Sequence, residues 1–184
     1  MNILRYVILA IGTIAWFAPF PVYYTRGAKG PLTKDYAARW GILLECVAYS
    51  LLWQGHFWLI TPAFWQFALS VLLFVIAAVT SWTASIALGR YLRVDAALDT
   101  EHELIRSGAY RFVRNPIYSS MLCVILDTAL LVTPLWLFFI ALAVFLVGTT
   151  IRIRAEEKLL AARFGEQFTA YRRSVSRLIP FVRL

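Results

Sequence analysis

The sequence predicts an all-α, polytopic membrane protein with about five transmembrane helices. Apolar residues make up 61% of the 184 residues, charged residues only 15%, and the mean hydropathy is +0.70. A soluble domain of this size would have to expose much of that apolar surface to water. The apolar residues also fall into runs long enough to cross a bilayer, and the basic residues gather in the segments between those runs.

The apolar runs set the number and the order of the spans. A bilayer core about 30 Å thick needs a helix of about 20 residues. The third run has no charged residue, the fourth is short and contains Asp127, and the fifth begins at Pro134, a residue suited to the first turn of a helix. We expect transmembrane helices over residues 3–24, 39–60, 64–89, 117–132 and 134–151. The connections 61–63 and 133–134 are so short that they predict two helical hairpins.

The basic residues predict the orientation in the membrane. Of the 18 Lys and Arg residues, 17 lie in the segments 25–39 and 90–116 and in the tail from residue 152. With five spans, these three segments fall on the same side of the membrane. The positive-inside rule makes that side, with the C-terminus, cytoplasmic and places the N-terminus outside. The net charge of +8 therefore indicates topology and attraction to anionic lipid headgroups, rather than nucleic-acid binding.

Several kinds of site are not expected. Cys46 and Cys123 lie inside apolar runs, and the sequence has no CxxC or Cys/His spacing, so neither a disulfide framework nor a metal site is predicted. The sequence also has no GxGxxG, P-loop, HExxH or GxSxG motif. A nucleotide-like cofactor would have to bind without a Rossmann unit.

The first polar stretch interrupts the apolar sequence before the fourth span. Gly108 follows a serine and predicts a turn. Pro116 keeps Asn115 out of helical geometry, so we expect Asn115 to cap the helix that Pro116 begins. The free N–H groups of a helix start suit an anionic group, which Arg111 and Arg114 would reinforce. The alternative is a capped helix with interfacial Arg and Tyr anchors.

The second polar stretch is the C-terminal tail. Residues 152–163 are expected to continue the fifth helix beyond the membrane. Glu156 and Glu157 point about 100° apart on such a helix, so one can face a ligand while the other pairs with an Arg. The alternative is a solvated helix with intrahelical ion pairs. Gly165 is expected to end this helix. A short amphipathic helix over 166–174 would then lie on the membrane surface.

Two acidic residues lie inside expected spans. Glu45 falls in the second span and Asp127 in the fourth. Ionisable residues are costly in lipid and by default indicate an interior polar site. We favour hydrogen bonding between these two spans, with Asp127 protonated, over a catalytic role.

The two polar stretches together resemble the isoprenylcysteine carboxyl methyltransferase family and its phospholipid methyltransferase relatives. Residues 108–118 read GAYRFVRNPIY, similar to the family's G-x-Y-R-x-x-R-[HN]-P-x-Y. Residues 156–165 read EEKLLAARFG, with Tyr171 and Pro180 behind them, similar to its E-E-x7-G…Y…P tail. The first motif alone is moderately specific, and the pair at this distance is strong. The resemblance covers roughly residues 88–182.

The resemblance implies a single integral membrane methyltransferase domain over residues 1–184. Three helices would fill residues 1–89, and residues 90–184 would form the catalytic half. The implied cofactor is S-adenosylmethionine, bound at the cytosolic surface between the 90–116 loop and the C-terminal helices. The residues implied in cofactor binding are Leu104, Ile105, Gly108, Tyr110, Asn115, Pro116, Tyr118 and Glu156. Arg152 and Glu157 are implied at the reacting end, and the reverse assignment of Glu156 and Glu157 remains open.

The implied substrate is lipophilic and enters from the bilayer. If the acceptor is a carboxylate of the isoprenylcysteine type, it is ionised at neutral pH, and Arg152 would orient it bidentately. If the acceptor is a phospholipid amine or a thiol, a base is required, and Glu157 is the candidate. Asn115 replaces the usual His of the motif, and it cannot act as a base.

Two other functions remain open. Membrane reductases of the sterol reductase type have a similar R-x-P-x-Y stretch but use NADPH; the short chain and the Glu156–Glu157 tail favour the methyltransferase. A non-enzymatic membrane protein, such as a scaffold or a transporter subunit, is the other alternative. Transporters usually show internal repeats and polar breaks at mid-membrane. This sequence shows no repeat, and its polar residues gather at one interface.

Overall fold

The computed structural model describes residues 2–24, 32–56, 59, 61–99 and 103–182. In chain order the elements are α1 (Asn2–Phe17), α2 (Pro19–Tyr24), β1 (Leu32–Lys34), α3 (Ala38–Leu51), α4 (Phe64–Leu88), η2 (Gly89–Tyr91), β2 (Ala97–Asp99), η3 (Gly108–Arg111), α5 (Pro116–Val132), α6 (Leu135–Phe164) and α7 (Glu166–Ser174). The η elements are short 3-10 helices. The protein is thus mainly helical, as the sequence predicts.

Helices long and apolar enough to cross a membrane cover Ile3–Tyr23, Phe64–Tyr91 and Leu135–Phe164 in the described part of the chain. They correspond to the first, third and fifth expected spans. The outward surfaces of α1, α4 and α6 are rich in exposed apolar side chains, as expected for helices that face lipid. These findings identify a membrane protein.

The second and fourth expected spans are shorter helices. α5 has 17 residues. α3 has 14 residues and ends at Leu51, so the expected helix over 39–60 is too long. The chain turns after α3, because Gly55 and His56 both adopt positive φ angles, of 75° and 48°. Residues 57, 58 and 60 of that expected span lie outside the described residues.

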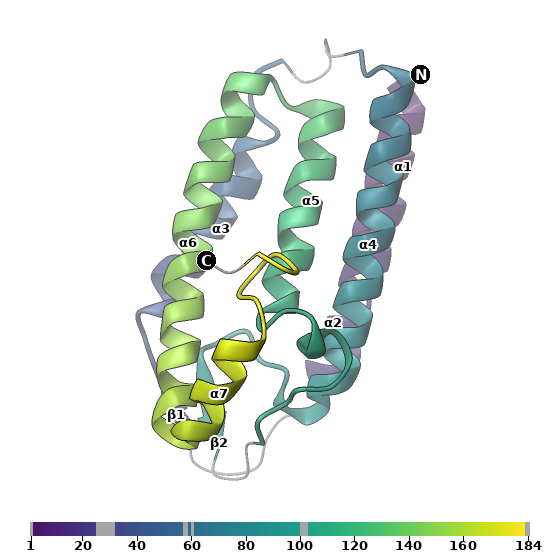
Figure 1. Cartoon of the computed structure of the whole chain (residues 1–184). Helices are drawn as coiled ribbons and strands as arrows, with labels where there is room; N and C mark the ends of the chain where they lie inside the picture. Colours follow the sequence, from purple (N-terminus) through teal and green to yellow (C-terminus); the bar gives the residue numbers. More distant parts are fainter. Residues whose placement is uncertain (1, 25–31, 57–58, 60, 100–102, 183–184) are drawn as a thin grey trace.

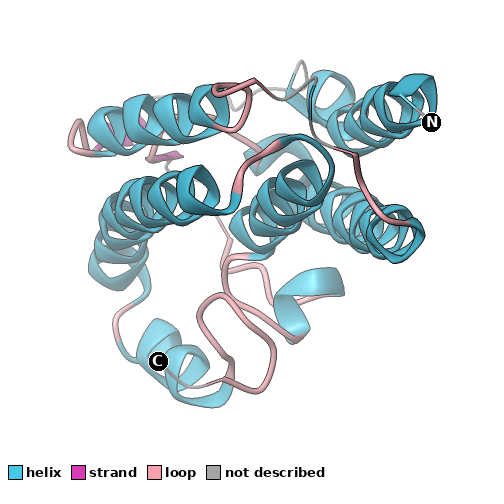
Figure 2. Ribbon diagram, turned by 90° about the horizontal axis from the view of Figure 1, so that it is seen from above, coloured by secondary structure: helices cyan, strands magenta, loops and turns pink. Residues whose placement is uncertain are grey.

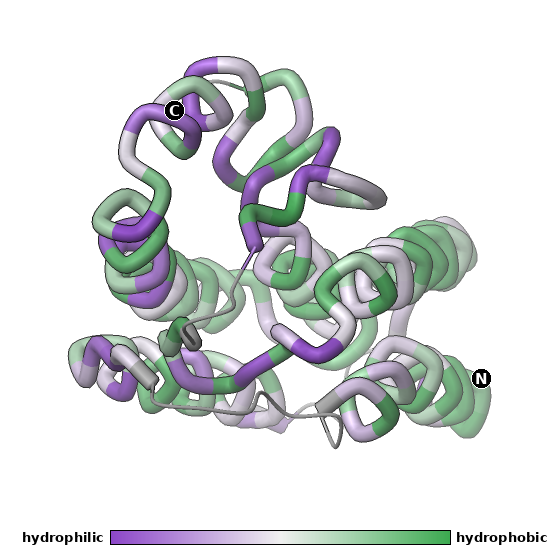
Figure 3. Tube along the Cα trace, turned by 90° about the horizontal axis from the view of Figure 1, so that it is seen from below, coloured by the Kyte–Doolittle hydropathy of each residue, from purple (hydrophilic) through white to green (hydrophobic). Residues whose placement is uncertain are grey.

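The helices run side by side along a common direction (Figure 1). Seen from above, α4, α5 and α6 lie in one row, with α3 against α6 and α1 against α4 (Figure 2). β1, β2, η3 and α7 gather at one end of the bundle (Figure 1). Hydrophilic segments surround α7 at this end, whereas the helices that lead away from it are largely hydrophobic (Figure 3). We call it the polar end of the bundle. The grouping of the polar segments matches the sequence-based expectation.

Glycines bring α3 and α6 unusually close. A Cβ atom added to Gly148 would lie 2.8 Å from the carbonyl oxygen of Gly41 and 2.9 Å from Leu44 Cβ. A Cβ atom on Gly41 would lie 2.6 Å from the carbonyl oxygen of Gly148. Real Cβ atoms essentially never come that near, so only glycine fits at both positions. Small residues allow membrane helices to pack backbone against backbone in this way.

The C-terminal tail folds back along the start of α5. The backbone N–H of Arg114 donates to Ser176 O at 2.8 Å, and Val113 and Ser176 form a parallel β-bridge. The Ser119 hydroxyl donates to Leu178 O. The tail therefore fastens α7 against η3 and α5, and Gly165, with φ of 50°, makes the turn from α6 into α7.

A two-stranded antiparallel sheet covers the polar end beside α6. β1 pairs with β2 so that Leu32 lies opposite Asp99 and Lys34 opposite Ala97. An ion pair joins Lys34 Nζ to Asp95 Oδ2 at 3.6 Å. The sheet ties the segment before α3 to the 90–116 segment.

Candidate functional site

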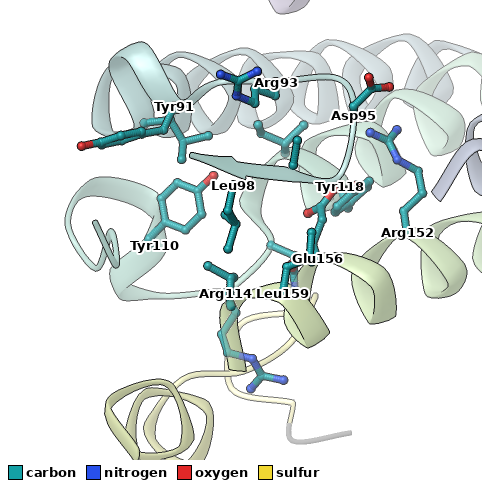
Figure 4. A pocket seen from close by; sticks show the side chains of 15 residues that line it. Tyr91, Arg93, Asp95, Leu98, Tyr110, Arg114, Tyr118, Arg152, Glu156 and Leu159 are labelled. Atoms are coloured by element: carbon teal, nitrogen blue, oxygen red, sulfur yellow. Dashed lines mark hydrogen bonds between the residues drawn. The ribbon is translucent and has the colours of Figure 1, made fainter. Parts of the chain in front are cut away.

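Two neighbouring cavities open at the polar end of the bundle, between α5 and α6. The first has a volume of about 130 Å³ and the second about 60 Å³. Their linings share Leu88, Tyr110, Arg114, Asn115 and Leu160. In the first cavity, Tyr110, Tyr118 and Glu156 lie around Leu98 of the β2 strand (Figure 4).

A charged and aromatic cluster forms one wall of the first cavity. The Tyr118 hydroxyl donates to Glu156 Oε1. The guanidinium carbon of Arg152 lies 4.9 Å from the centre of the Tyr118 ring, in a cation–π contact. Arg152 and Glu156 stand one helical turn apart on α6, so the same face of that helix presents both. Tyr118 comes from α5, where Pro116 begins the helix.

The Arg152 guanidinium is held on its far side by α3 and by the 90–116 segment. Nη1 donates to Glu45 Oε2 at 2.7 Å, and Nη2 donates to Val94 O at 2.8 Å. The other Glu45 oxygen accepts from the Thr149 hydroxyl at 3.0 Å. Arg152 Nε is buried and finds no hydrogen-bond partner among the described residues.

The expected hydrogen bonding between the second and fourth spans forms through the Tyr49 hydroxyl, which donates to Met121 O at 2.9 Å, and the expectation that Glu45 and Asp127 make it is wrong. α3 packs on α6, because Gly41 and Gly148 allow the two helices to touch, and Glu45 therefore meets α6 rather than α5. Asp127 of α5 is fully buried, and its Oδ1 accepts from the Thr128 hydroxyl at 3.0 Å within its own helix.

Glu157 has a different environment from Glu156. Its Oε1 accepts from Arg114 Nε at 3.1 Å and from Asn115 Nδ2 at 3.4 Å. Arg114 also donates to Arg172 O at 2.9 Å and to Val175 O, so the same guanidinium fastens α7 and the tail. The two adjacent carboxylates therefore point in different directions, as the helix geometry predicts.

Asn115 occupies the expected capping position but does not cap with its side chain. It precedes Pro116 as the residue at the N-terminus of α5, and no side-chain capping bond forms there. Its amide nitrogen donates instead to Arg177 O at 3.0 Å and to Glu157. The tail competes for the side chain, so Asn115 links three elements that surround the cavities.

The second cavity is mainly apolar and aromatic. Leu104, Ile105 and Phe168 line it together with Tyr110 and Tyr171. The Tyr171 hydroxyl donates to Tyr110 O at 2.6 Å. Burial raises the pKa of Tyr171 to about 12 and the pKa of Tyr110 well above its ordinary range. Both phenols are therefore neutral at physiological pH.

The structure brings most of the expected site residues to these cavities. Those that line one or both are Leu104, Ile105, Tyr110, Asn115, Tyr118, Arg152, Glu156 and Glu157. Pro116 lines neither cavity and begins α5. Gly108 also lines neither; its φ is +59°, and a Cβ atom there would meet Thr83 O at 3.1 Å, so it lets η3 approach α4.

Sequence reasoning missed the residues that precede and form β2. Tyr91, Arg93, Asp95, Ala97 and Leu98 line the first cavity. The charged residues Arg93 and Asp95 lie in the 90–116 segment, which the sequence already places at the site. Their charges were therefore a usable signal that they line the cavity. It also missed Glu45 as the partner of Arg152. In the described part of the chain, no group of three or more His, Cys, Asp or Glu side chains could hold a metal ion.

A comparison with protein families matches this region. A family model described as phospholipid methyltransferase matches residues 65–167, which is more than half of the chain. The matched range contains nearly all of α4, the whole of α5 and α6, and most of the residues that line the two cavities. A search of curated proteins found no match.

Proposed function

Since the chain belongs to the phospholipid methyltransferase family and is thus a membrane methyltransferase, we propose that it transfers the methyl group of S-adenosylmethionine to a lipophilic acceptor. The observation that carries this proposal is the Tyr118–Glu156 hydrogen bond beside Arg152, at the wall of a cavity that adjoins an aromatic one. When bound, the cofactor supplies an activated methyl group on a sulfonium, so the protein has mainly to align the reactants.

The side chains of the two cavities fit the chemistry of this cofactor. An adenine ring suits the apolar and aromatic second cavity, lined by Leu104, Ile105 and Phe168. A cation suits the Glu156 carboxylate in the first cavity. Arg93, on the same cavity, supplies a charge for the carboxylate of the amino-acid part. The shared lining of the two cavities would let one extended molecule occupy both.

We assign Glu156 to the reacting end and Glu157 to a structural role. Glu156 faces the first cavity, where Tyr118 orients its carboxylate. Glu157 is engaged by Arg114 and Asn115, and this cluster holds α7 and the tail in place. Tyr110 and Tyr171 line the second cavity, and the hydrogen bond from the Tyr171 hydroxyl to Tyr110 O joins α7 to η3 there.

The acceptor is proposed from the surroundings of Arg152. Two of its guanidinium nitrogens already donate to Glu45 and Val94. An acceptor carboxylate would have to compete with Glu45 for this cation, which favours an amine or a thiol over a carboxylate of the isoprenylcysteine type. Glu156 then lies where a base is needed. A groove of about 790 Å³ with a mainly apolar lining, between α4, α5 and the tail, supports the lipophilic class of the substrate.

We propose that the polar end of the bundle faces the cytosol, where the cofactor is available. The clustering of basic residues in the segments at this end supports that orientation. The bilayer then delivers the acceptor from the side, and the cofactor enters from the water.

A methyl-transfer assay tests the function. The purified protein in nanodiscs receives S-adenosylmethionine with a labelled methyl group and one of three acceptors: phosphatidylethanolamine, a farnesylated cysteine whose α-amine is acetylated, or a long-chain thiol. We expect lipid-extractable label with the amine or the thiol. Glu156→Gln should lower the rate on the order of a hundredfold. Glu166→Gln, at an exposed glutamate on α7, is the matched control and should behave as wild type.

The outcomes separate the alternatives. Label in the farnesylated cysteine alone would assign the acceptor as a carboxylate. No transfer to any acceptor, together with oxidation of NADPH, would show that the protein acts as a reductase rather than as a methyltransferase. Equal rates for Glu156→Gln and wild type would show that Glu156 does not act at the reacting end.

A further inference from the structure

We propose that Glu45 is a positioning residue of the methyl-transfer site, which neutralises and holds Arg152 and thereby keeps the site selective for a cationic cofactor. This inference rests on the proposed function. Glu45 lies on α3, outside the residues 65–167 that match the family.

Both oxygens of Glu45 are engaged with α6. The side chain is buried, with 3% of the residue exposed. One oxygen accepts from Arg152 at 2.7 Å and the other from Thr149 at 3.0 Å. Arg152 is also shielded from solvent, so this is a buried ion pair. Removing one partner of such a pair leaves the other charge uncompensated.

The α3–α6 crossing fixes the position of this carboxylate. Gly41 and Gly148 bring the two backbones into contact one helical turn from Glu45 and Arg152. A side chain held between two touching backbones has little freedom to move. Glu45 therefore acts as a fixed negative charge behind Arg152.

Arg152 connects Glu45 to the wall of the first cavity. Its guanidinium lies over the Tyr118 ring, and the Tyr118 hydroxyl donates to Glu156. The contacts thus run in sequence from Glu45 through Arg152 and Tyr118 to Glu156. Glu45 does not line either cavity, so it touches no ligand there and acts only through Arg152.

Glu45 also sets the charge at this wall of the site. Replacing it with Gln adds one positive unit there, whatever the protonation of Glu156. S-adenosylmethionine carries a positive sulfonium, whereas S-adenosylhomocysteine has a neutral thioether in its place. An added positive charge should therefore weaken binding of the first more than binding of the second. A loss of packing alone would weaken both by the same factor.

The ratio of the two dissociation constants, S-adenosylmethionine over S-adenosylhomocysteine, measures this effect. Calorimetry on the full-length protein in nanodiscs gives both constants. Glu45→Gln should raise the ratio on the order of tenfold, the effect of a unit charge about 10 Å away at an effective dielectric constant of about 20. Arg152→Gln should lower the ratio by a similar factor. The double variant, which keeps the wild-type net charge, should restore the ratio.

The matched control is Asp127→Asn. It removes another fully buried acid, on α5, that contacts neither Arg152 nor the cavities, and the ratio should not change. If Glu45→Gln does not fold, the effect of the same substitution is measured in the Arg152→Gln background, where no buried cation is left unpaired.

The two proposals fail in different ways. If the wild-type protein binds neither ligand, the proposed function fails. If it binds both, and Glu45→Gln leaves the ratio at the wild-type value, or adding Glu45→Gln to Arg152→Gln leaves the ratio at the Arg152→Gln value, the role of Glu45 is refuted while the cofactor site stands.

Discussion

Replacing Gly148 with Ala should push α3 away from α6 and weaken the Glu45–Arg152 ion pair. The added Cβ atom would lie 2.8 Å from Gly41 O and 2.9 Å from Leu44 Cβ. Neither neighbour is the end of a flexible side chain, so the helices themselves must move. The perturbation is one methyl group at a residue that lines neither cavity.

The size of the movement follows from the contact distances. Ordinary van der Waals contact begins at 3.4 Å, so the carbonyl must retreat by about 0.6 Å from its 2.8 Å position. A shift of that size would stretch the Glu45–Arg152 bond from 2.7 Å to about 3.3 Å, near the limit of hydrogen bonding, and the Glu45–Thr149 bond from 3.0 Å to about 3.6 Å, beyond that limit. Overpacking of this kind costs about 1–3 kcal/mol, against about 1 kcal/mol that Ala gains over Gly within a helix.

Thermal unfolding and ligand binding in nanodiscs measure the result. We expect Gly148→Ala to lower the unfolding temperature and to weaken binding of S-adenosylmethionine. Ala143→Leu enlarges an exposed position on the same helix and is the control, with no change expected in either quantity. If Gly148→Ala unfolds and binds as the wild type does, the close crossing does not hold the ion pair, and the explanation of the Glu45 position is wrong.

Two further substitutions test how the polar end is held together. Tyr171→Phe removes the hydrogen bond to Tyr110 O and should lower the free energy of unfolding by about 1 kcal/mol in a thermal or denaturant unfolding assay. The pKa of Tyr171 is raised to about 12 from an ordinary 10.0. The loss of stability should therefore be constant at neutral pH and disappear only as the pH rises from about 10 toward about 12. Asp35→Asn removes an acceptor for the Ala37 N–H and for Lys158 Nζ, which hold the pKa of that carboxyl below its ordinary 3.8. A lowered folded-state pKa stabilises the protein above the ordinary pKa, so the variant should be at most about 1 kcal/mol less stable at neutral pH. In unfolding scans this gap should begin to narrow as the pH falls below 3.8 and close only below the lowered folded-state pKa. An unchanged gap at acidic pH would show that the Asp35 charge is not the cause.

The elements predicted best from the sequence are those with a strong local signal. The run 64–89 has no charged residue, and α4 covers Phe64–Leu88. Gly165 was expected to end a helix, and it separates α6 from α7 with a positive φ. The expected helix over 166–174 matches α7, Glu166–Ser174. In each case the neighbouring residues alone determine the local conformation.

Features that depend on contacts between distant parts of the chain could not be predicted from the sequence. β1 and β2 have three residues each and lie far apart in the chain, so neither shows an alternating pattern. The end of α3 at Leu51 falls inside a run that stays apolar, where hydropathy gives no sign of a turn. The partner of Glu45 depends on which helix α3 packs against, and only the three-dimensional packing determines that.

The sequence predicts most of the expected residues that line the two cavities, but not the contacts that those residues make. The adjacency of Glu156 and Glu157 predicts that the two carboxylates diverge. The rotation of α6 that turns Glu156 toward the cavity is set by its packing against α3 and by the Arg114 contacts of the tail. Neither constraint has a local sequence signal. The ion-pair partner of Arg152 could not be predicted for the same reason, since it comes from another helix.

Calorimetric titration of the purified protein with S-adenosylmethionine tests the central claim most directly. NADPH is titrated in parallel, and Glu156→Gln and Glu166→Gln serve as the site variant and the matched control. We expect the wild type and Glu166→Gln to bind S-adenosylmethionine with equal affinity, Glu156→Gln to bind it on the order of tenfold or more weakly, and none of them to bind NADPH. Binding of NADPH without S-adenosylmethionine, or equal binding of S-adenosylmethionine by all three proteins, would contradict the assignment of this cavity.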